Sequence, residues 1–212
     1  MKFPMTVAAA AIAITASANA TAFTPGTPIS TMPPPVLGQG GDVKAVFLYF
    51  NAADTDTMEI SMPILMSLFT NKTTPVGTTV DLGNLSGALQ WELSDLSTGH
   101  SWFSDTGDGH GYFHAAYSTN YSDFGVGAMD PLAAAAIAGL PNVTLIGWED
   151  HACQSPVGSG SCPGVDWDYN DLIFAVSVDV LHNPPPPVPE PLTLSLLGAG
   201  LLGAFGLRRK KA

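Results

Sequence analysis

Apolar and polar residues alternate with a period of two over several short stretches of this 212-residue chain. The clearest of these stretches are residues 57–62, 89–94 and 172–180. Because successive side chains of a β-strand point to opposite faces, the period indicates strands with one buried face. Residues 43–50 are almost wholly apolar, which is typical of a strand buried on both faces or of a central strand, and residues 143–148 are a further strand candidate. Gly, Pro, Asn and Asp clusters separate these stretches, so the sequence predicts a mainly β fold: an antiparallel β-sandwich, jelly-roll-like.

One short helix is predicted within this β pattern, at residues 131–138. Asp130 is a residue type that caps helix N-termini, and Pro131 suits the first helical position. Gly139 is expected to end the helix.

Composition excludes several classes of protein. The chain has 18 acidic and 7 basic residues, giving a formal net charge of −11. It lacks the basic surface that neutralises phosphates, so no nucleic-acid partner is expected. A hydrophobic content of 46% is too high for a disordered acidic chain, and two cysteines are too few for a disulfide-rich miniature. After these exclusions, the composition indicates one globular domain of ordinary size.

The N-terminus has the pattern of a secretory signal peptide. Lys2 precedes an apolar stretch at residues 7–14, and Ala18-Asn19-Ala20 supplies the small residues that signal peptidase requires. We therefore assign residues 1–20 to a signal peptide. Residues 21–41 are rich in Pro and Gly and are predicted to be an irregular lead-in.

The C-terminus combines a proline-rich spacer, an apolar segment and a basic tip. The spacer covers residues 183–191 and ends in Pro189-Glu190-Pro191. Residues 192–207 carry no charge, and as a helix they span about 24 Å, slightly less than a hydrocarbon core of about 30 Å. Arg208 and Arg209 begin the basic tip, which is expected to stay on the cytoplasmic side. A plain C-terminal anchor is the alternative interpretation.

This arrangement resembles the PEP-CTERM sorting signal of Gram-negative bacteria. The resemblance implies that an exosortase removes residues 192–212, which act as a transient anchor in the inner membrane. The protein is then passed to the cell surface or extracellular matrix. The folded module is predicted at residues 42–182.

Acidic residues concentrate in two segments of this module. Glu149-Asp150 follows the strand candidate 143–148, and residues 166–171 lead into the strand at 172–180. In an extended segment, alternation separates Asp166, Asp168 and Asn170 from Trp167 and Tyr169. Oxygen ligands without His or Cys suit Ca²⁺. The predicted ligands are Glu149, Asp150, Asp166, Asp168, Asn170 and Asp171.

This calcium site is not an EF-hand. A loop starting at Asp166 would need Gly at its sixth position and Glu at its twelfth, where this chain has Asp171 and Ser177. A site at a sheet edge fits better. The alternative is a set of solvated turn carboxylates, since Asp and Asn favour turns in any case.

The two acidic segments also resemble a domain family of unknown function in exported, adhesin-like bacterial proteins. The family's ending is Gly-aromatic-Glu-Asp, then Asp-x-Asp-aromatic-Asn-Asp, matched here at residues 147–150 and 166–171. His114 resembles an upstream element of the same family. Calcium binding is suspected for that family and no enzymatic activity is implied. The insert 151–165 is longer here than the family pattern.

Cys153 and Cys162 lie in this insert. In an exported, oxidising context they are expected to form a disulfide, which would stabilise the fold by about 2–3 kcal/mol. The spacing excludes a CxxC redox pair.

Taken together, these features predict a non-catalytic structural or adhesive module, with exopolysaccharide as a candidate partner. The alternative is a carbohydrate-binding or glycoside-cleaving protein, since carboxylates are abundant.

Overall fold

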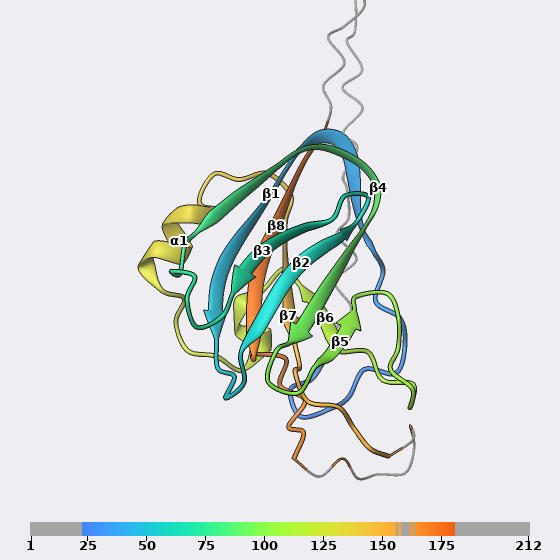
Figure 1. Cartoon of the computed structure of the whole chain (residues 1–212). Coiled ribbons are helices and arrows are strands. Elements are labelled where there is room, and N and C mark those ends of the chain that lie inside the picture. The colour runs from blue at the N-terminus through green and yellow to red at the C-terminus, as the bar shows by residue number, and fades with distance from the viewer. Residues whose placement is uncertain (1–22, 156, 158–161, 163, 181–212) are drawn as a thin grey trace, which may run out of the picture. The chain divides into compact units, whose positions relative to one another are not determined.

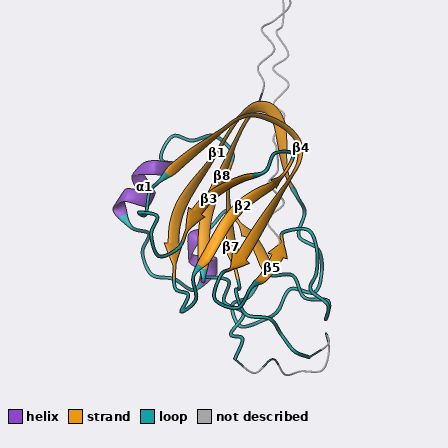
Figure 2. Cartoon of the chain, viewed as in Figure 1, coloured by secondary structure: helices purple, strands orange, loops and turns teal. Residues whose placement is uncertain are grey.

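The computed structural model describes residues 23–155, 157, 162 and 164–180. The predicted signal peptide, the proline-rich spacer and the C-terminal apolar segment lie outside these residues. Within them the fold is mainly β, as predicted, with eight strands, one short α-helix and one 3-10 helix (Figures 1 and 2). The strands are β1 Val36–Phe50, β2 Asp56–Met62, β3 Met66–Thr70, β4 Thr79–Asp95, β5 His100–Phe103, β6 Ala115–Ser118, β7 Val143–Trp148 and β8 Leu172–Val180.

The strands form one antiparallel sheet in the order β3-β2-β4-β1-β8-β7-β6, with β5 paired to β4. The long strand β4 takes part in both halves of this sheet. Its first part, up to Leu89, pairs with β1, and its remainder from Gln90 pairs with β2. Figure 1 shows β2 and β3 lying in front of β1 and β8.

Aromatic contacts show that the sheet folds back on itself as a sandwich. Phe69 of β3 and Phe174 of β8 are separated by three strands in the sheet order, yet their ring centroids lie 6.3 Å apart. Neighbouring strands in a flat sheet are about 4.8 Å apart, so a flat sheet would keep these rings far apart. Trp91 of β4 also packs edge-on against Phe174, at 5.2 Å.

A second apolar cluster covers the other face of β1 and β8. Val46, Leu48, Ile173 and Ala175 belong to it, so both faces of these two strands are buried, as predicted for residues 43–50. It also contains side chains from α1 Pro131–Ile137, from the 3-10 helix Tyr121–Phe124, from Tyr112 and from the loop 165–171.

The helix and the first strand differ slightly from the expected bounds. The side chain of Asp130 caps α1 by accepting a hydrogen bond from the N–H of Leu132 at 2.7 Å, and the helix ends at Ile137. Strand β1 begins at Val36, so the expected module boundary at residue 42 falls inside a strand. The preceding segment also packs on the module, where Ile29 forms a bridge with Phe113.

Candidate metal centre

Sheet register brings the two acidic segments together. Trp148 at the end of β7 is paired with Leu172 at the start of β8. The N–H of Asp171 donates to the Trp148 carbonyl oxygen at 3.1 Å, and the N–H of Asp150 donates to Asp171 Oδ2 at 2.8 Å. Residues that flank a register pair lie side by side, so Glu149 and Asp150 lie next to Asp171.

The loop before β8 is turned and not extended. Trp167 and Tyr169 have φ values of 53° and 56°, in the left-handed region that non-glycine residues adopt rarely. Both aromatic side chains are buried, and the Tyr169 hydroxyl accepts from the Ile29 N–H at 2.7 Å and lies 3.3 Å from the Phe113 carbonyl oxygen. The expected extended conformation is therefore wrong, because anchoring of these aromatic side chains determines the backbone path.

Glu149 lies at the centre of the cluster that this loop completes. Its side chain carboxylate and those of Asp166 and Asp168 have oxygens within 4.8 Å of one another. A second such group combines Glu149 with Asp150 and Asp171. Each group could hold a metal ion.

Glu149 is also buried and poorly hydrogen-bonded. It is 1% exposed, neither carboxylate oxygen accepts a hydrogen bond of ordinary geometry from a described residue, and the backbone N–H of His151 offsets only part of the rise in its pKa. An ionised carboxylate in this state is strongly unfavourable unless a proton or a cation compensates its charge.

Burial and mutual repulsion raise the pKa values of the cluster. Burial contributes most to the raised pKa of Glu149, followed by the charges of Asp171, Asp166 and Asp150. The pKa values of Asp150, Asp168 and Asp171 are raised as well, each chiefly by burial. The cluster without a cation therefore binds protons more tightly than ordinary carboxylates do.

Asn170 connects the cluster to the core. Its side-chain amide donates to Asp168 Oδ2 at 2.5 Å and to the Phe124 carbonyl oxygen at 3.4 Å, which orients the Asp168 carboxylate. The amide oxygen of Asn170 is itself buried and has no hydrogen-bond partner among the described residues. The structure thus adds an unsatisfied neutral oxygen to the acidic ones, and an all-oxygen donor set suits Ca²⁺.

His114 contacts the cluster through the backbone of Glu149. It is buried, its ring stacks on Trp102 with centroids 4.6 Å apart, and its Nδ1 lies 2.9 Å from the Glu149 carbonyl oxygen. Its Nε2 lies 3.4 Å from Asp108 Oδ2. Burial alone would raise the pKa of Asp108, but hydrogen bonds from His114 and from the N–H groups of Tyr112 and His110 lower it.

The two cysteines form the predicted disulfide. Cys153 and Cys162 are bonded, and their Cα atoms lie 5.1 Å apart. The bond closes the insert between the two acidic segments. Cys153 itself is buried against the outer apolar cluster.

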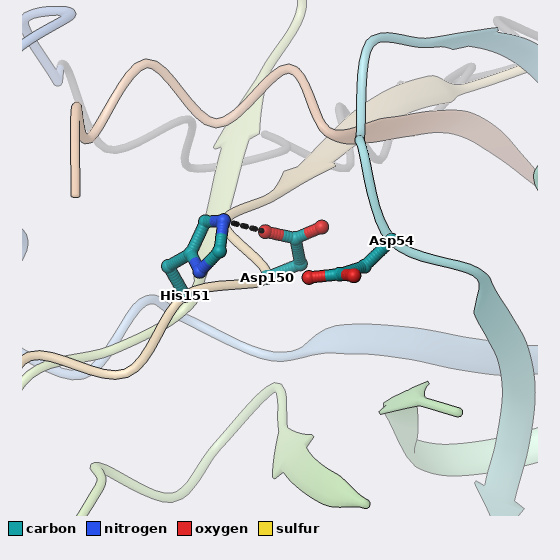
Figure 3. A group of neighbouring side chains, drawn as sticks. All are labelled: Asp54, Asp150 and His151. Carbon is teal, nitrogen blue, oxygen red and sulfur yellow. Dashed lines mark ion pairs between the residues drawn. The ribbon is translucent and has the colours of Figure 1, made fainter. Parts of the chain in front are cut away.

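Sequence reasoning missed a third group, shown in Figure 3. Asp54, between β1 and β2, has a carboxylate oxygen within 4.8 Å of ligand atoms of Asp150 and His151. Asp56, at the start of β2, is fully buried nearby. Burial and the charges of Asp150, Asp95 and Asp54 raise its pKa to about 8. The only local signal was an Asp-x-Asp step after the apolar stretch 43–50, which resembles an ordinary turn.

Comparison with known proteins adds information at the C-terminus. Residues 187–210 match the model of the PEP-CTERM protein-sorting motif. This motif implies an exported protein that an exosortase processes and that is sorted to the cell surface. No family matches the remainder of the chain, and no curated protein or solved structure matches it. Among the described residues, no helix is long and apolar enough to cross a membrane.

Proposed function

We propose that the protein is displayed at the cell surface or in the extracellular matrix as a non-catalytic structural or adhesive module stabilised by Ca²⁺. In this proposal a signal peptidase removes residues 1–20 on export. The ion is held by Glu149, Asp150, Asp166, Asp168, Asn170 and Asp171. It fastens the loop before β8 to the end of β7.

The observation that carries the proposal is the state of Glu149. Its buried carboxylate accepts no hydrogen bond of ordinary geometry from the described part of the chain, and it faces other carboxylates. Solvated turn carboxylates, the alternative interpretation, would be exposed to water. Glu149 is 1% exposed, which supports a bound cation over that alternative.

Calcium titration of the full chain tests the proposal. After removal of metal with EDTA, millimolar Ca²⁺ is expected to raise Tm. At a Ca²⁺ concentration of about 100 times Kd the fold gains about 2.7 kcal/mol, and each 1 kcal/mol raises Tm by about 2–4 °C. Asp168→Ala should remove most of this rise. Asp42→Ala, at an exposed carboxylate in β1, is the control and should retain it. An unchanged Tm, or an equal rise in Asp168→Ala, would overturn the proposal.

The adhesive role is tested on the same protein with purified exopolysaccharide. Saturable binding without release of sugar is expected for an adhesive module. Release of sugar would instead support the alternative glycoside-cleaving function.

A further inference from the structure

The third group described above, Asp54, Asp150 and His151, lies where strand ends meet. Asp54 belongs to the loop between β1 and β2, and Asp150 and His151 follow β7, which is joined to β1 through β8 in the same layer. Figure 3 shows the Asp150 carboxylate between the side chains of Asp54 and His151. The ligand atoms of all three residues lie within 4.8 Å of one another.

Buried carboxylates belong to this cluster. Asp150 is 1% exposed; neither of its carboxylate oxygens accepts a hydrogen bond of ordinary length, and its Oδ1 forms an ion pair with His151 Nε2 at 3.5 Å. Asp56 is fully buried, and its Oδ1 accepts no hydrogen bond from a described residue. Among the described residues, no lysine forms an ion pair with these groups. A protonated His151 offsets one negative charge at most, so the three carboxylates keep an excess of negative charge.

The loop that carries Asp54 is held in place by buried hydrogen bonds. Asn71, which is fully buried, donates from Nδ2 to the Asp54 carbonyl oxygen at 3.0 Å and to Asp56 Oδ2 at 2.7 Å. Its Oδ1 accepts from the N–H of Asp56 at 3.1 Å. Asn71 thus fixes Asp54 and Asp56 relative to each other, as expected of a preformed site.

The imidazole distinguishes this cluster from the all-oxygen one. His151 Nε2 lies 3.5 Å from Asp150 Oδ1, which is longer than an ordinary hydrogen bond of about 2.7–3.2 Å. Two ligands of a tetrahedral zinc ion, with bonds of about 2.0–2.1 Å, lie about 3.3–3.4 Å apart. Imidazole with carboxylates is a donor set that Zn²⁺ accepts, whereas Ca²⁺ takes oxygen ligands.

We propose that Asp54, Asp150 and His151 form a second divalent-cation site, selective for Zn²⁺ over Ca²⁺, with the free oxygen of Asp56 beside it. Half of the His151 side chain is exposed, so the ion keeps access to solvent. Bound Zn²⁺ links the β1–β2 loop to the end of β7. Asp150 is also a member of the proposed calcium group, but Asp54 and His151 are not, so the two sites can be tested separately.

Zinc titration of the full chain tests the inference. The protein is purified without a histidine tag, stripped with EDTA and titrated calorimetrically with Zn²⁺ at pH 7 in saturating Ca²⁺. One Zn²⁺ per chain is expected to bind. Asp54→Asn and His151→Gln should each weaken Zn²⁺ binding at least ten-fold while leaving the Ca²⁺-dependent rise in Tm unchanged. Asp168→Ala should show the reverse pattern.

Matched controls separate this site from other acidic and histidine side chains. His110→Gln and Asp42→Asn, at exposed positions, should bind Zn²⁺ like the unchanged chain. The His151 ring NMR signals should shift on addition of Zn²⁺, which a purely structural role would not produce.

Two outcomes would overturn the inference. The first is the absence of Zn²⁺ binding, which is expected if shared protons alone compensate the charges of Asp56 and Asp150. Binding unaffected by Asp54→Asn and His151→Gln would also overturn it. Zn²⁺ binding without any Ca²⁺ effect would refute the proposed function but leave this site standing.

Discussion

At the scale of single residues, Glu149 is the most unfavourable charge in the metal-free cluster. Glu149→Gln keeps the side-chain shape and removes the charge that burial penalises. We expect this substitution to stabilise the metal-free chain at pH 7 by about 1 kcal/mol or more, raising Tm by about 2–4 °C. The same substitution should abolish the further rise in Tm that Ca²⁺ produces.

Thermal unfolding with EDTA and with Ca²⁺ measures both effects. Glu92→Gln is the control, because Glu92 lies on β4 with a partly exposed side chain and should change neither value. A Glu149→Gln chain that is less stable without metal yet still responds to Ca²⁺ would show that Glu149 is not a ligand.

The sequence predicted one part of the candidate site and missed another for a physical reason. Glu149 and Asp168 belong to short acidic motifs beside apolar strands, so local pattern was enough to select them. Asp54 and Asp56 lie near Asp150 because the end of β1, the start of β8 and the end of β7 are in register, and no local pattern reports that long-range pairing. The left-handed backbone at Trp167 was missed because it depends on where its buried ring packs.

At the scale of elements, Gly147 in β7 makes the close approach of the loop before β8 possible. A Cβ at this position would lie 2.2 Å from the Tyr169 carbonyl oxygen and 2.4 Å from the Phe124 ring. Gly147→Ala must therefore displace the loop or the strand. We expect it to destabilise the chain by about 1–3 kcal/mol and to weaken Ca²⁺ binding, because Asp168 and Asp166 move with the loop.

Chemical denaturation and Ca²⁺ titration measure this prediction. Gly127→Ala is the matched control, since nothing lies within 4 Å of its added Cβ and its φ is not positive. Equal stability of the two variants would mean that the loop can shift without consequence, which contradicts a fixed metal centre.

Helices and strands could be predicted where their own residues carry a strong local pattern. The apolar faces of β8 and the capped helix α1 were predicted from sequence because alternation and capping are local properties. The short strands β3, β5 and β6 were missed, because their four or five residues acquire strand structure from their partners. The passage of β4 from one layer to the other was also not predicted, because Gly83-Asn84 and Ser86-Gly87 are typical of turns, whereas here both glycines take positive φ within one continuous strand.

At the scale of the whole molecule, the acidic clusters lie where separate strands end together. Asp171 does not compensate the negative charge of Asp150. The carbonyl oxygen of Asp171 accepts a hydrogen bond from the Asn51 N–H at 3.2 Å, which joins the ends of β1, β7 and β8. Repulsion at this junction opposes the association of the elements that the apolar core holds together. The free energy of unfolding of the whole chain should therefore depend on how far the acidic clusters are protonated.

The raised pKa values set the direction of this pH dependence. The pKa of Asp56 is raised to about 8, chiefly by burial, and those of Glu149, Asp150, Asp168 and Asp171 are raised too. Between pH 5 and 8 the folded chain thus holds more protons than the unfolded chain, so its free energy of unfolding falls as pH rises. Each additional proton held lowers it by about 1.4 kcal/mol per pH unit. The lowered pKa of Asp108 does not affect the pH dependence of stability in this interval, because above pH 5 its carboxylate is ionised in both the folded and the unfolded chain.

Urea denaturation of the EDTA-treated chain at pH 5 to 8 measures this dependence. We expect the unfolding midpoint to fall across the interval, and saturating Ca²⁺ to reduce the fall because the cation replaces the protons. The stabilisation by Ca²⁺ should accordingly grow from pH 5 to pH 8. Glu149→Gln should flatten the profile of the metal-free chain, whereas Glu92→Gln should not. A metal-free midpoint that rises with pH would mean that the buried carboxylates are already compensated within the fold, and it would remove the electrostatic basis for a bound cation.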